Sequence, residues 1–414
     1  MDLKITPPQS VCGTVRISGS KNGALPLFAA SILGSGKTTI EDAPDVSDIR
    51  LMHKMLDASG ADVTAHGNKT EINPQNIDPC AFADESAGRI RGSFLLAGAC
   101  LAKFGHVKIS MPGGCPIGLR PIDLHLKGFA SLGADISTEN GVVTLKADRL
   151  SGADIYLDFP SVGATENIMI AASLADGKTV ISNASAEPEI CALADMLISM
   201  GAEIDGAGTD RITVIGKRGL GGTAVTAIPD RIEAGTYMML AAAAKGKVVL
   251  ENVYHPHLTP VTAKLREMGA DIKELGNSIS IDAACGLCGA DIKTMPYPGF
   301  PTDMQAPFCA LLCVCRGSGI VVETVFENRF LYVGELIRMG ASIKTDGRTA
   351  VVEGGAELTG AAVQCRDLRG GAALIIAACT ARGSSVIHDA EHILRGYADI
   401  TNKLRALGCS AEIV

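Results

Sequence analysis

Apolar and polar positions along this chain repeat in one pattern, which closes six times on a nearly identical phrase. In each copy an alanine-rich apolar stretch precedes a glycine turn, a short β-branched run and an amphipathic helix that ends at a glycine. These closing glycines are Gly60, Gly133, Gly201, Gly269, Gly340 and Gly408. A regular interval of about 70 residues indicates one structural unit that is copied along the chain.

The third copy shows what each unit is built from. Its apolar stretch, residues 167–174, is followed after a turn by the β-branched run 179–181. The helix predicted over residues 192–200 carries apolar side chains at the spacing of one buried face. Gly201 follows where a helix end favours a left-handed residue. Each unit is therefore predicted to be a small layer of helices and strands.

Six such units in a chain of 414 residues predict an α/β protein with two lobes of three units each. We place the lobe boundary near residues 226–232, before the fourth unit. Residues 21–228 then form one lobe, which carries the Cys115 loop, and residues 1–20 join residues 229–414 in a second, discontinuous lobe. The first predicted strand, around residues 3–17, precedes all six units and is expected to pair with the last one.

Composition narrows the class of protein. Hydrophobic residues make up 47% of the chain, but no apolar run is long enough for a transmembrane segment, and residues 1–4 do not begin a signal peptide. The 13 cysteines are scattered without a framework spacing, which favours reduced thiols in a cytoplasmic protein. A formal net charge of -8 argues against nonspecific nucleic-acid binding.

Two short motifs suggest chemistry that we do not expect. Residues 34–38 resemble part of a phosphate-binding loop, but Ser31 stands where that loop requires a glycine. Other units carry similar residues at the same place, so we interpret this segment as the turn from helix to strand. Cys285 and Cys288 suggest a metal or redox pair, but no second pair lies at zinc spacing. We expect two unrelated thiols in a surface loop.

Three regions depart from the repeat with polar residues that a core would exclude. In the first, Lys21 and Asn22 precede an alanine-rich helix expected over residues 24–32. Cationic and amide donors at a helix N-terminus form an anion site by geometry alone. The alternative is a serine or asparagine that caps the helix, with Lys21 in solvent.

The second region, residues 112–125, places three glycines and three prolines around Cys115 and Arg120. Glycine permits unusual backbone shapes and proline stiffens the chain around them, so this segment has the composition of a lid over a ligand. A thiol beside an arginine can act as a nucleophile or as an acid. The alternative is a buried cysteine in a tight turn.

The third region is a set of polar segments in the C-terminal half. Asp303 stands at the start of the fifth unit's helix, where it is a plausible N-cap. Arg329 belongs to a crowded polar segment, residues 323–330. Arg369 and Arg395 each lie in a short basic segment. Surface ion pairs are the usual fate of such residues, but several arginines together would suit a substrate with phosphate and carboxylate groups.

In these regions the chain resembles the UDP-N-acetylglucosamine 1-carboxyvinyltransferase family, which carries out the first committed step of peptidoglycan synthesis. The resemblance covers essentially the whole chain, and its motifs are residues 18–22, 112–124, 161–167, 229–233, 300–305, 323–330 and 395–397. It implies the enolpyruvyl transferase fold, a two-lobed inside-out α/β barrel of six βαβαββ repeats. The wider superfamily also contains 5-enolpyruvylshikimate-3-phosphate synthase.

The resemblance also implies the reaction. Phosphoenolpyruvate would donate its enolpyruvyl group to the 3′-hydroxyl of UDP-N-acetylglucosamine, and phosphate would leave. The route would be addition and then elimination through a tetrahedral intermediate, without a metal or an organic cofactor. No nucleic acid and no membrane insertion are expected, and the oligomeric state stays open.

The family's residue roles carry over to the matching positions of this chain. Cys115 would be the general acid at the methylene carbon of phosphoenolpyruvate, and Asp303 would take or guide the hydroxyl proton. The anionic groups would be held or supported by Lys21, Asn22, Arg91, Arg120, Arg329, Arg369 and Arg395. The UDP-sugar would be held by Arg120, Pro121, Ile122, Asp123, Leu124, Ser161, Val162, Gly163, Asp303 and Val325.

The resemblance further implies that the epoxide antibiotic fosfomycin alkylates Cys115 and that a Cys115→Asp variant escapes it. Some positions differ from those of many relatives. Phe159 stands where a basic residue is common, Leu394 replaces an acid, and two glycines follow Arg369.

Two alternatives stay open. The shikimate-branch enzyme has the same fold and donor, but the cysteine-bearing segment 112–120 speaks against it. A non-catalytic relative that binds a nucleotide sugar would be expected to lack a catalytic residue, and here the set is complete.

Overall fold

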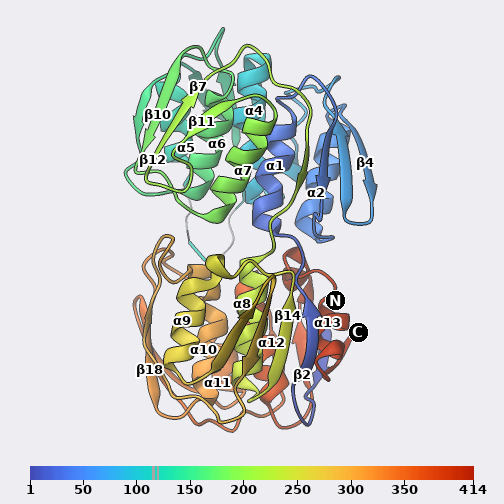
Figure 1. Ribbon diagram of the computed structural model, residues 1–414, viewed down its shortest axis with the longest axis vertical. Coiled ribbons are helices and arrows are strands. Elements are labelled where there is room, and N and C mark those ends of the chain that lie inside the picture. The colour runs from blue at the N-terminus through green and yellow to red at the C-terminus, as the bar shows by residue number, and fades with distance from the viewer. Residues whose placement is uncertain (114–116, 119–120) are drawn as a thin grey trace. The chain divides into compact units, whose positions relative to one another are not determined.

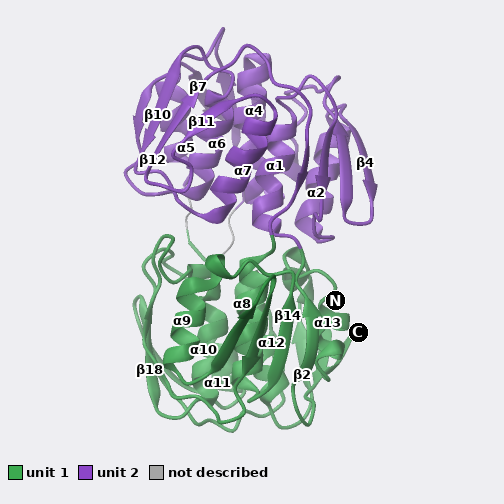
Figure 2. Cartoon of the chain, in the orientation of Figure 1, with its two compact units in different colours: residues 1–18, 115–119, 229–414 green, residues 19–114, 120–228 purple. Residues whose placement is uncertain are grey.

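The computed structural model describes residues 1–113, 117–118 and 121–414. The fold is α/β, and the chain divides into two compact units (Figure 1, Figure 2). Among the described residues, unit 1 comprises 1–18, 117–118 and 229–414, and unit 2 comprises 19–113 and 121–228. Ile117 and Gly118 thus lie with unit 1, although the sequence analysis assigned the whole surrounding segment to the other lobe.

Unit 2 consists of three layers of helices and strands in succession. Its helices are α1 (Lys21–Ser31), α2 (Ser47–Ala58), α3 (Glu85–Arg89), α4 (Leu95–Phe104), α5 (Asp123–Ser131), α6 (Val162–Ala172) and α7 (Pro188–Ser199), with a 3-10 helix at Arg91–Phe94. Its strands are β3 (Thr38–Glu41), β4 (Asp62–His66), β5 (Lys69–Asn73), β6 (His106–Ser110), β7 (Asp135–Glu139), β8 (Val142–Lys146), β9 (Asp154–Tyr156), β10 (Lys178–Ser182), β11 (Glu203–Asp205), β12 (Arg211–Ile215) and β13 (Ala224–Thr226). In the described part of unit 2 they form sheets of order β13-β3-β5-β4, β6-β8-β7 and β11-β12-β10-β9.

Unit 1 repeats this plan. Its helices are α8 (Arg231–Ala243), α9 (Thr259–Glu267), α10 (Gln305–Val314), α11 (Val333–Arg338), α12 (Leu368–Thr380) and α13 (Ile400–Ala406), with 3-10 helices at His255–Leu258, Thr302–Met304 and Ala390–Arg395. Its strands are β1 (Leu3–Thr6), β2 (Cys12–Arg16), β14 (Lys247–Glu251), β15 (Asp271–Leu275), β16 (Ser278–Asp282), β17 (Ile292–Lys293), β18 (Ser318–Val322), β19 (Ser342–Asp346), β20 (Thr349–Glu353), β21 (Ala362–Gln364), β22 (Ser385–His388) and β23 (Ser410–Ile413). Its sheets have the orders β15-β16-β14-β2, β17-β18-β20-β19 and β21-β22-β1-β23.

The central helices of each unit are buried on nearly every side, and the sheets lie outside them (Figure 1). Every residue of α6 from 164 to 172 is buried, as is every residue of α8 from 232 to 243. A helix that is apolar all round belongs in a core. Accordingly, α1, α4 and α6 pack together in unit 2, and α8, α10 and α12 pack together in unit 1. This is the inside-out arrangement that the resemblance implied.

Two strands exchange between the units where the chain crosses. Strand β2 pairs in parallel with β14 of unit 1, although the next helix, α1, belongs to unit 2. Strand β13 pairs in parallel with β3 of unit 2, although the next helix, α8, belongs to unit 1. The strand that precedes α8 in the chain therefore completes the sheet of β3, and the strand that precedes α1 completes the sheet of β14.

Residues 3–17 form two strands and not the single strand that the sequence predicted. Strand β1 pairs antiparallel with β22 and β23, so the expected pairing with the last unit is confirmed for β1. Strand β2 instead joins the sheet of the fourth unit. Pro7 and Pro8 separate the two strands because proline has no N–H to donate to a sheet.

The closing glycine of each repeat ends an outer helix, as predicted. Gly201 follows α7 and Gly269 follows α9, both with a φ of 109°, and this left-handed conformation favours glycine. Helix α7 begins at Pro188, earlier than the predicted residue 192, since proline fits the first turn of a helix.

The structure accounts for the two short motifs whose suggested chemistry we did not expect, residues 34–38 and the pair Cys285 and Cys288. Residues 34–38 connect α1 to β3, which confirms the turn, and Lys37 pairs with Glu71 at 2.8 Å. Cys285 and Cys288 are exposed thiols that follow β16. Among the described residues, no helix combines the length and apolar character needed to cross a membrane.

Asn167, in the middle of α6, binds α4 across the core of unit 2. Its Oδ1 accepts the Gly98 N–H at 2.9 Å, and its Nδ2 donates to the Phe94 carbonyl at 2.8 Å. A Cβ on Gly98 would overlap Asn167 Oδ1 and lie 2.6 Å from the Asn167 carbonyl oxygen. Glycine at position 98 therefore permits the close approach of the two helices.

Replacing Gly98 with alanine is expected to lower the free energy of unfolding by about 1–3 kcal/mol, because the added methyl pushes α4 away from α6. Gly334→Ala in α11 is the matched control, since nothing lies within 4 Å of its added Cβ and alanine favours a helix over glycine by about 1 kcal/mol. Urea unfolding followed by circular dichroism measures both variants. A Gly98→Ala midpoint equal to that of the unsubstituted protein would contradict the tight contact.

Candidate active site

The carboxylate of Asp303 is held by two arginines of unit 1. Arg329 Nη2 donates to Asp303 Oδ1 at 2.7 Å, and Arg369 Nη2 and Nε donate to Oδ2 at 2.9 and 3.2 Å. The two arginine side chains are 3% and 5% exposed, and the Asp303 side chain is 26% exposed. Burial opposes the charge of Arg369, but the attraction of Asp303 outweighs it and raises the pKa of Arg369. We call these three residues the Asp303 cluster.

The suggestion that Asp303 caps a helix is wrong. Asp303 lies within the 3-10 helix Thr302–Met304, and neither that helix nor α10 has a side-chain N-cap bond. Within the described part of the chain, the buried Arg329 Nε and Arg369 Nη1 have no acceptor. A buried charged donor without an acceptor costs free energy, so the Asp303 cluster is suited to an anionic ligand.

Glu323 connects the Val325 segment to the Asp303 cluster. Its carboxylate accepts the N–H groups of Val325 at 2.8 Å and Phe326 at 3.1 Å, and the residue is 1% exposed. The same carboxylate accepts the Thr302 hydroxyl at 2.9 Å. Since Thr302 adjoins Asp303, one buried acid sets the position of both segments.

Arg395 lies on an element that packs against α12, the helix that carries Arg369. It ends the 3-10 helix Ala390–Arg395, which packs against α12. A Cβ on Gly371 would lie 2.5 Å from Ile393 Cγ1, which explains the glycine after Arg369 that distinguishes this chain. Arg369 and Arg395 therefore lie on adjoining elements of unit 1.

Lys21 forms a buried ion pair in unit 2. Its Nζ lies 3.1 Å from Asp48 Oδ2, and the two side chains are 10% and 6% exposed. Ser20 caps α1 by accepting the Gly23 N–H, so the helix begins at Lys21 and not at residue 24. Of the alternatives, the serine cap is correct but the solvated lysine is wrong. Asn22 lies beside Lys21 in the first turn and is half-buried.

The segments expected to hold the UDP-sugar come together at the starts of α5 and α6. Arg91 Nη2 donates to the Pro121 carbonyl at 2.8 Å, just before α5. Ser161 caps α6, and a Cβ on Gly163 would lie 3.2 Å from the His125 ring of α5. Burial, with a smaller effect of Arg91, lowers the pKa of His125 to about 3. His125 is therefore neutral, and it bonds Asn167 at 3.1 Å.

The structure thus groups the predicted residues within each unit. Unit 1 holds Asp303, Val325, Arg329, Arg369 and Arg395. Unit 2 holds Lys21, Asn22, Arg91, Pro121, Ile122, Asp123, Leu124, Ser161, Val162 and Gly163. Cys115 and Arg120 lie outside the described residues.

Sequence reasoning missed the residues that position this set. In the sequence, Asp48 is an ordinary acid in the first turn of a helix, and His125 is one residue within a motif. Neither pattern indicated that the side chain positions a site residue. Glu323 belonged to a recognised polar segment, but nothing indicated that its carboxylate binds the backbone.

Glu166 is an unusual acid within the buried part of α6. It lies one turn after Gly163 and is 5% exposed. Burial, together with the nearby carboxylates of Glu189 and Glu187, raises the pKa of Glu166 well above its ordinary value. Helix α7, which carries Glu189, packs against α6. The packing of unit 2 therefore favours the protonated form of Glu166.

The chain is similar to known proteins over nearly its whole length. The family model described as EPSP synthase (3-phosphoshikimate 1-carboxyvinyltransferase) matches residues 5–404. The chain is 52% identical over 410 residues to UDP-N-acetylglucosamine 1-carboxyvinyltransferase 2 of Clostridium tetani, covering 98% of this chain and 97% of that protein. It is 52% identical over 396 residues to UDP-N-acetylglucosamine 1-carboxyvinyltransferase 1 of Caldanaerobacter subterraneus, covering 96% and 95%.

Solved structures support the fold alone. The enolpyruvyl transferase NikO from Streptomyces tendae superposes with a TM-score of 0.90 at 23% identity, covering 99% of this chain and 98% of that one. EPSP synthase from Acinetobacter baumannii gives 0.77 at 19% identity, covering 100% of both chains. Fold and site together define an enolpyruvyl transferase. The chain belongs to the EPSP synthase family and, within it, to the UDP-N-acetylglucosamine 1-carboxyvinyltransferases.

The raised pKa of Glu166 predicts a pH-dependent stability. The native protein keeps a proton that the unfolded chain releases once the pH exceeds the ordinary value for glutamate. The stability from this group is therefore present at acid pH and is lost as the pH rises. Glu166→Gln is expected to remove that loss, which amounts to at most about 1.4 kcal/mol per pH unit in the free energy of unfolding.

Urea unfolding at several values between about pH 5 and pH 8 measures this effect. The control is Glu203→Gln in the same unit, because Glu203 is exposed and pairs with Lys217. A Glu166→Gln profile parallel to that of the unsubstituted protein would show that Glu166 does not hold the proton.

Proposed function

We propose that this protein transfers the enolpyruvyl group of phosphoenolpyruvate to the 3′-hydroxyl of UDP-N-acetylglucosamine and releases phosphate. Relatives that are 52% identical over nearly their whole length carry the name of this activity. The observation that carries the proposal is the Asp303 cluster, in which two buried arginines hold a partly exposed carboxylate. A base beside fixed cations matches a reaction that deprotonates a hydroxyl next to an anionic substrate.

The proposed reaction has two steps. In the addition, Asp303 takes the proton of the 3′-hydroxyl while the hydroxyl oxygen bonds to C2 of phosphoenolpyruvate. Cys115 gives a proton to the methylene carbon, and a tetrahedral intermediate results. In the elimination, the methyl carbon returns a proton to the Cys115 thiolate, the bond from C2 to the phosphate oxygen breaks, and the double bond forms again. The leaving phosphate takes the proton that Asp303 had accepted. The role of Cys115, like its alkylation by fosfomycin, rests on the family match alone.

The cationic residues are assigned to the charges of the substrate. Lys21, Arg120 and Arg395 hold phosphate and carboxylate while charge moves between them. Asn22 and Arg91 support this anion site. The unsatisfied donors of Arg329 and Arg369 give these two arginines the same task, because an anion would supply their missing acceptor.

We assign the binding of the UDP-sugar to segments that lead into the first turns of two helices. Residues 120–124 lead into α5 and residues 161–163 lead into α6, where His125 and Gly163 lie against each other. Val325, whose N–H is bound by Glu323, is assigned to the sugar as well. Rigid supports of this kind keep a substrate in the geometry that the reaction needs.

This reaction opens peptidoglycan biosynthesis, and we place the protein in the cytoplasm. That compartment fits the cysteines, because all those that the structure describes are free thiols.

Phosphate release from phosphoenolpyruvate by the purified protein tests the function. We expect release with UDP-N-acetylglucosamine and none with shikimate 3-phosphate. Release only with shikimate 3-phosphate would keep the fold and overturn the acceptor. No release with either acceptor from folded protein would favour a non-catalytic relative that binds a nucleotide sugar.

Asp303→Asn is expected to lower kcat by about 10²–10⁴-fold, because asparagine keeps the shape of the side chain but cannot take the proton. The affinity for UDP-N-acetylglucosamine, measured by calorimetry, should fall far less than kcat. Asp346→Asn, at an exposed carboxylate of unit 1, is the control. If Asp303→Asn retained the kcat of the unsubstituted enzyme, Asp303 would not be the base.

A further inference from the structure

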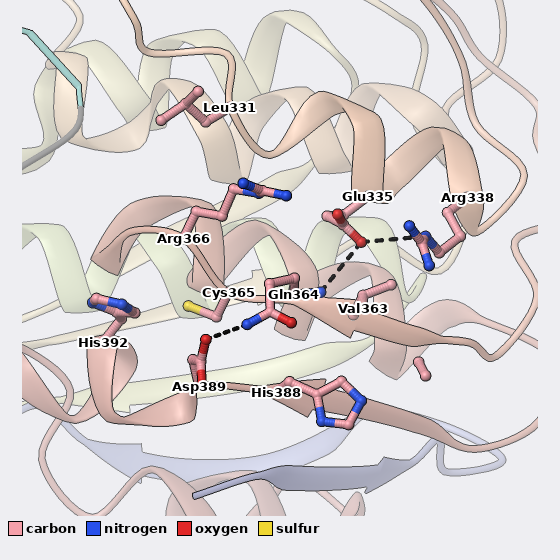
Figure 3. A pocket seen from close by; sticks show the side chains of 11 residues that line it. Leu331, Glu335, Arg338, Val363, Gln364, Cys365, Arg366, His388, Asp389 and His392 are labelled. Atoms are coloured by element: carbon pink, nitrogen blue, oxygen red, sulfur yellow. Dashed lines mark hydrogen bonds and ion pairs between the residues drawn. The ribbon is translucent and has the colours of Figure 1, made fainter.

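A pocket of about 770 Å³ lies wholly within unit 1, apart from the residues assigned to the reaction (Figure 3). Its walls come from α11, β21, β22 and the 3-10 helix Ala390–Arg395. The charged and titratable residues among them are Glu335, Arg338, Arg366, His388, Asp389 and His392. The volume falls within the range of about 300–1,000 Å³ that is usual for small-molecule sites.

Two nitrogen-bearing side chains of this pocket, those of Arg366 and His392, make no polar contact with the part of the chain that the structure describes. Among the described residues, the side chains of Arg366 and His392 have no hydrogen-bond or ion-pair partner. Figure 3 shows both at the pocket, with no bond drawn to either. By contrast, Arg338 pairs with Glu335 at 3.4 Å. A guanidinium with free donors in a pocket is suited to a phosphate group, which it can bind through two hydrogen bonds.

The pocket also carries acceptors. Glu335, which is 6% exposed, accepts the Gln364 N–H at 3.2 Å, and Asp389 accepts a hydrogen bond from the Gln364 side chain. A carboxylate has about four lone-pair sites, so both acids keep room for further donors. The pocket thus presents donors for an anion and acceptors for hydroxyl groups.

We propose that this pocket binds a small phosphomonoester that also carries hydroxyl groups, such as a sugar phosphate. The phosphate binds the Arg366 guanidinium, and the hydroxyls donate to Glu335 and Asp389. This site is distinct from the Asp303 cluster, and its binding does not require the proposed function to be correct.

The pocket shares three chain segments with the candidate active site. Residues 329–338 carry Arg329 and Glu335, and residues 366–369 carry Arg366 and Arg369. Residues 392–395 carry His392 and Arg395 on one 3-10 helix.

Nuclear magnetic resonance of the full chain with ¹³C-labelled histidine tests the site directly. His388 and His392 both line the pocket, and His388→Gln and His392→Gln variants assign their signals among the 8 histidines. The probes are glucose 6-phosphate, glycerol 3-phosphate, inorganic phosphate and glucose. We expect the two phosphomonoesters to move the His392 signal at lower concentration than inorganic phosphate, and glucose to have no effect.

Arg366→Gln is expected to weaken glucose 6-phosphate binding by about tenfold or more, because it removes the charged donor. Arg382→Gln is the matched control, since Arg382 is exposed and pairs with Glu357 outside the pocket. Unchanged signals of the other histidines confirm that the variant is folded. Undiminished binding by Arg366→Gln, or no movement of His392 with any probe, overturns the site. Equal affinity for glucose 6-phosphate and inorganic phosphate overturns the assignment of a phosphomonoester.

Discussion

The architecture depends on the burial of its central helices on every side. Polar side chains cost the least free energy at the ends of such a helix, because a polar side chain that is buried without a partner is destabilising. Four of the residues assigned to the reaction follow this rule. Lys21 begins α1, and Ser161 caps α6. Asp303 lies in the 3-10 helix that leads into α10, and Arg369 lies in the first turn of α12. The fold thereby collects chemical groups at the N-terminal ends of helices, where the helix dipole also favours anions.

Polar residues inside these helices obey the same constraint in another way. Asn167 is acceptable in the core because its amide binds the backbone of α4 and the ring of His125. Glu166 is buried near two other carboxylates, and its carboxyl group is instead favoured in the protonated form. Satisfaction by hydrogen bonds and loss of charge are the two ways in which a core accepts a polar side chain.

The Asp303 cluster shows how a buried charge can be kept for use. Two guanidinium groups out of water require an opposite charge, and Asp303 supplies one for both. The remaining positive charge and the donors without acceptors are then available to an anionic substrate. The pocket near Arg366 has a similar feature, because this guanidinium has no partner among the residues that the structure describes.

The sequence by itself determined the repeated unit, the turns at its closing glycines and the segments that carry the chemistry. These are local properties, because periodicity and backbone preference act over a few neighbouring residues. Only the tertiary structure decided the exchange of β2 and β13, the pairing of Lys21 with Asp48, and the binding of Asp303 by two arginines. Each of these contacts joins residues far apart in the chain. The sequence does not distinguish a carboxylate that caps a helix from one that pairs with a buried arginine, because packing alone selects the partner.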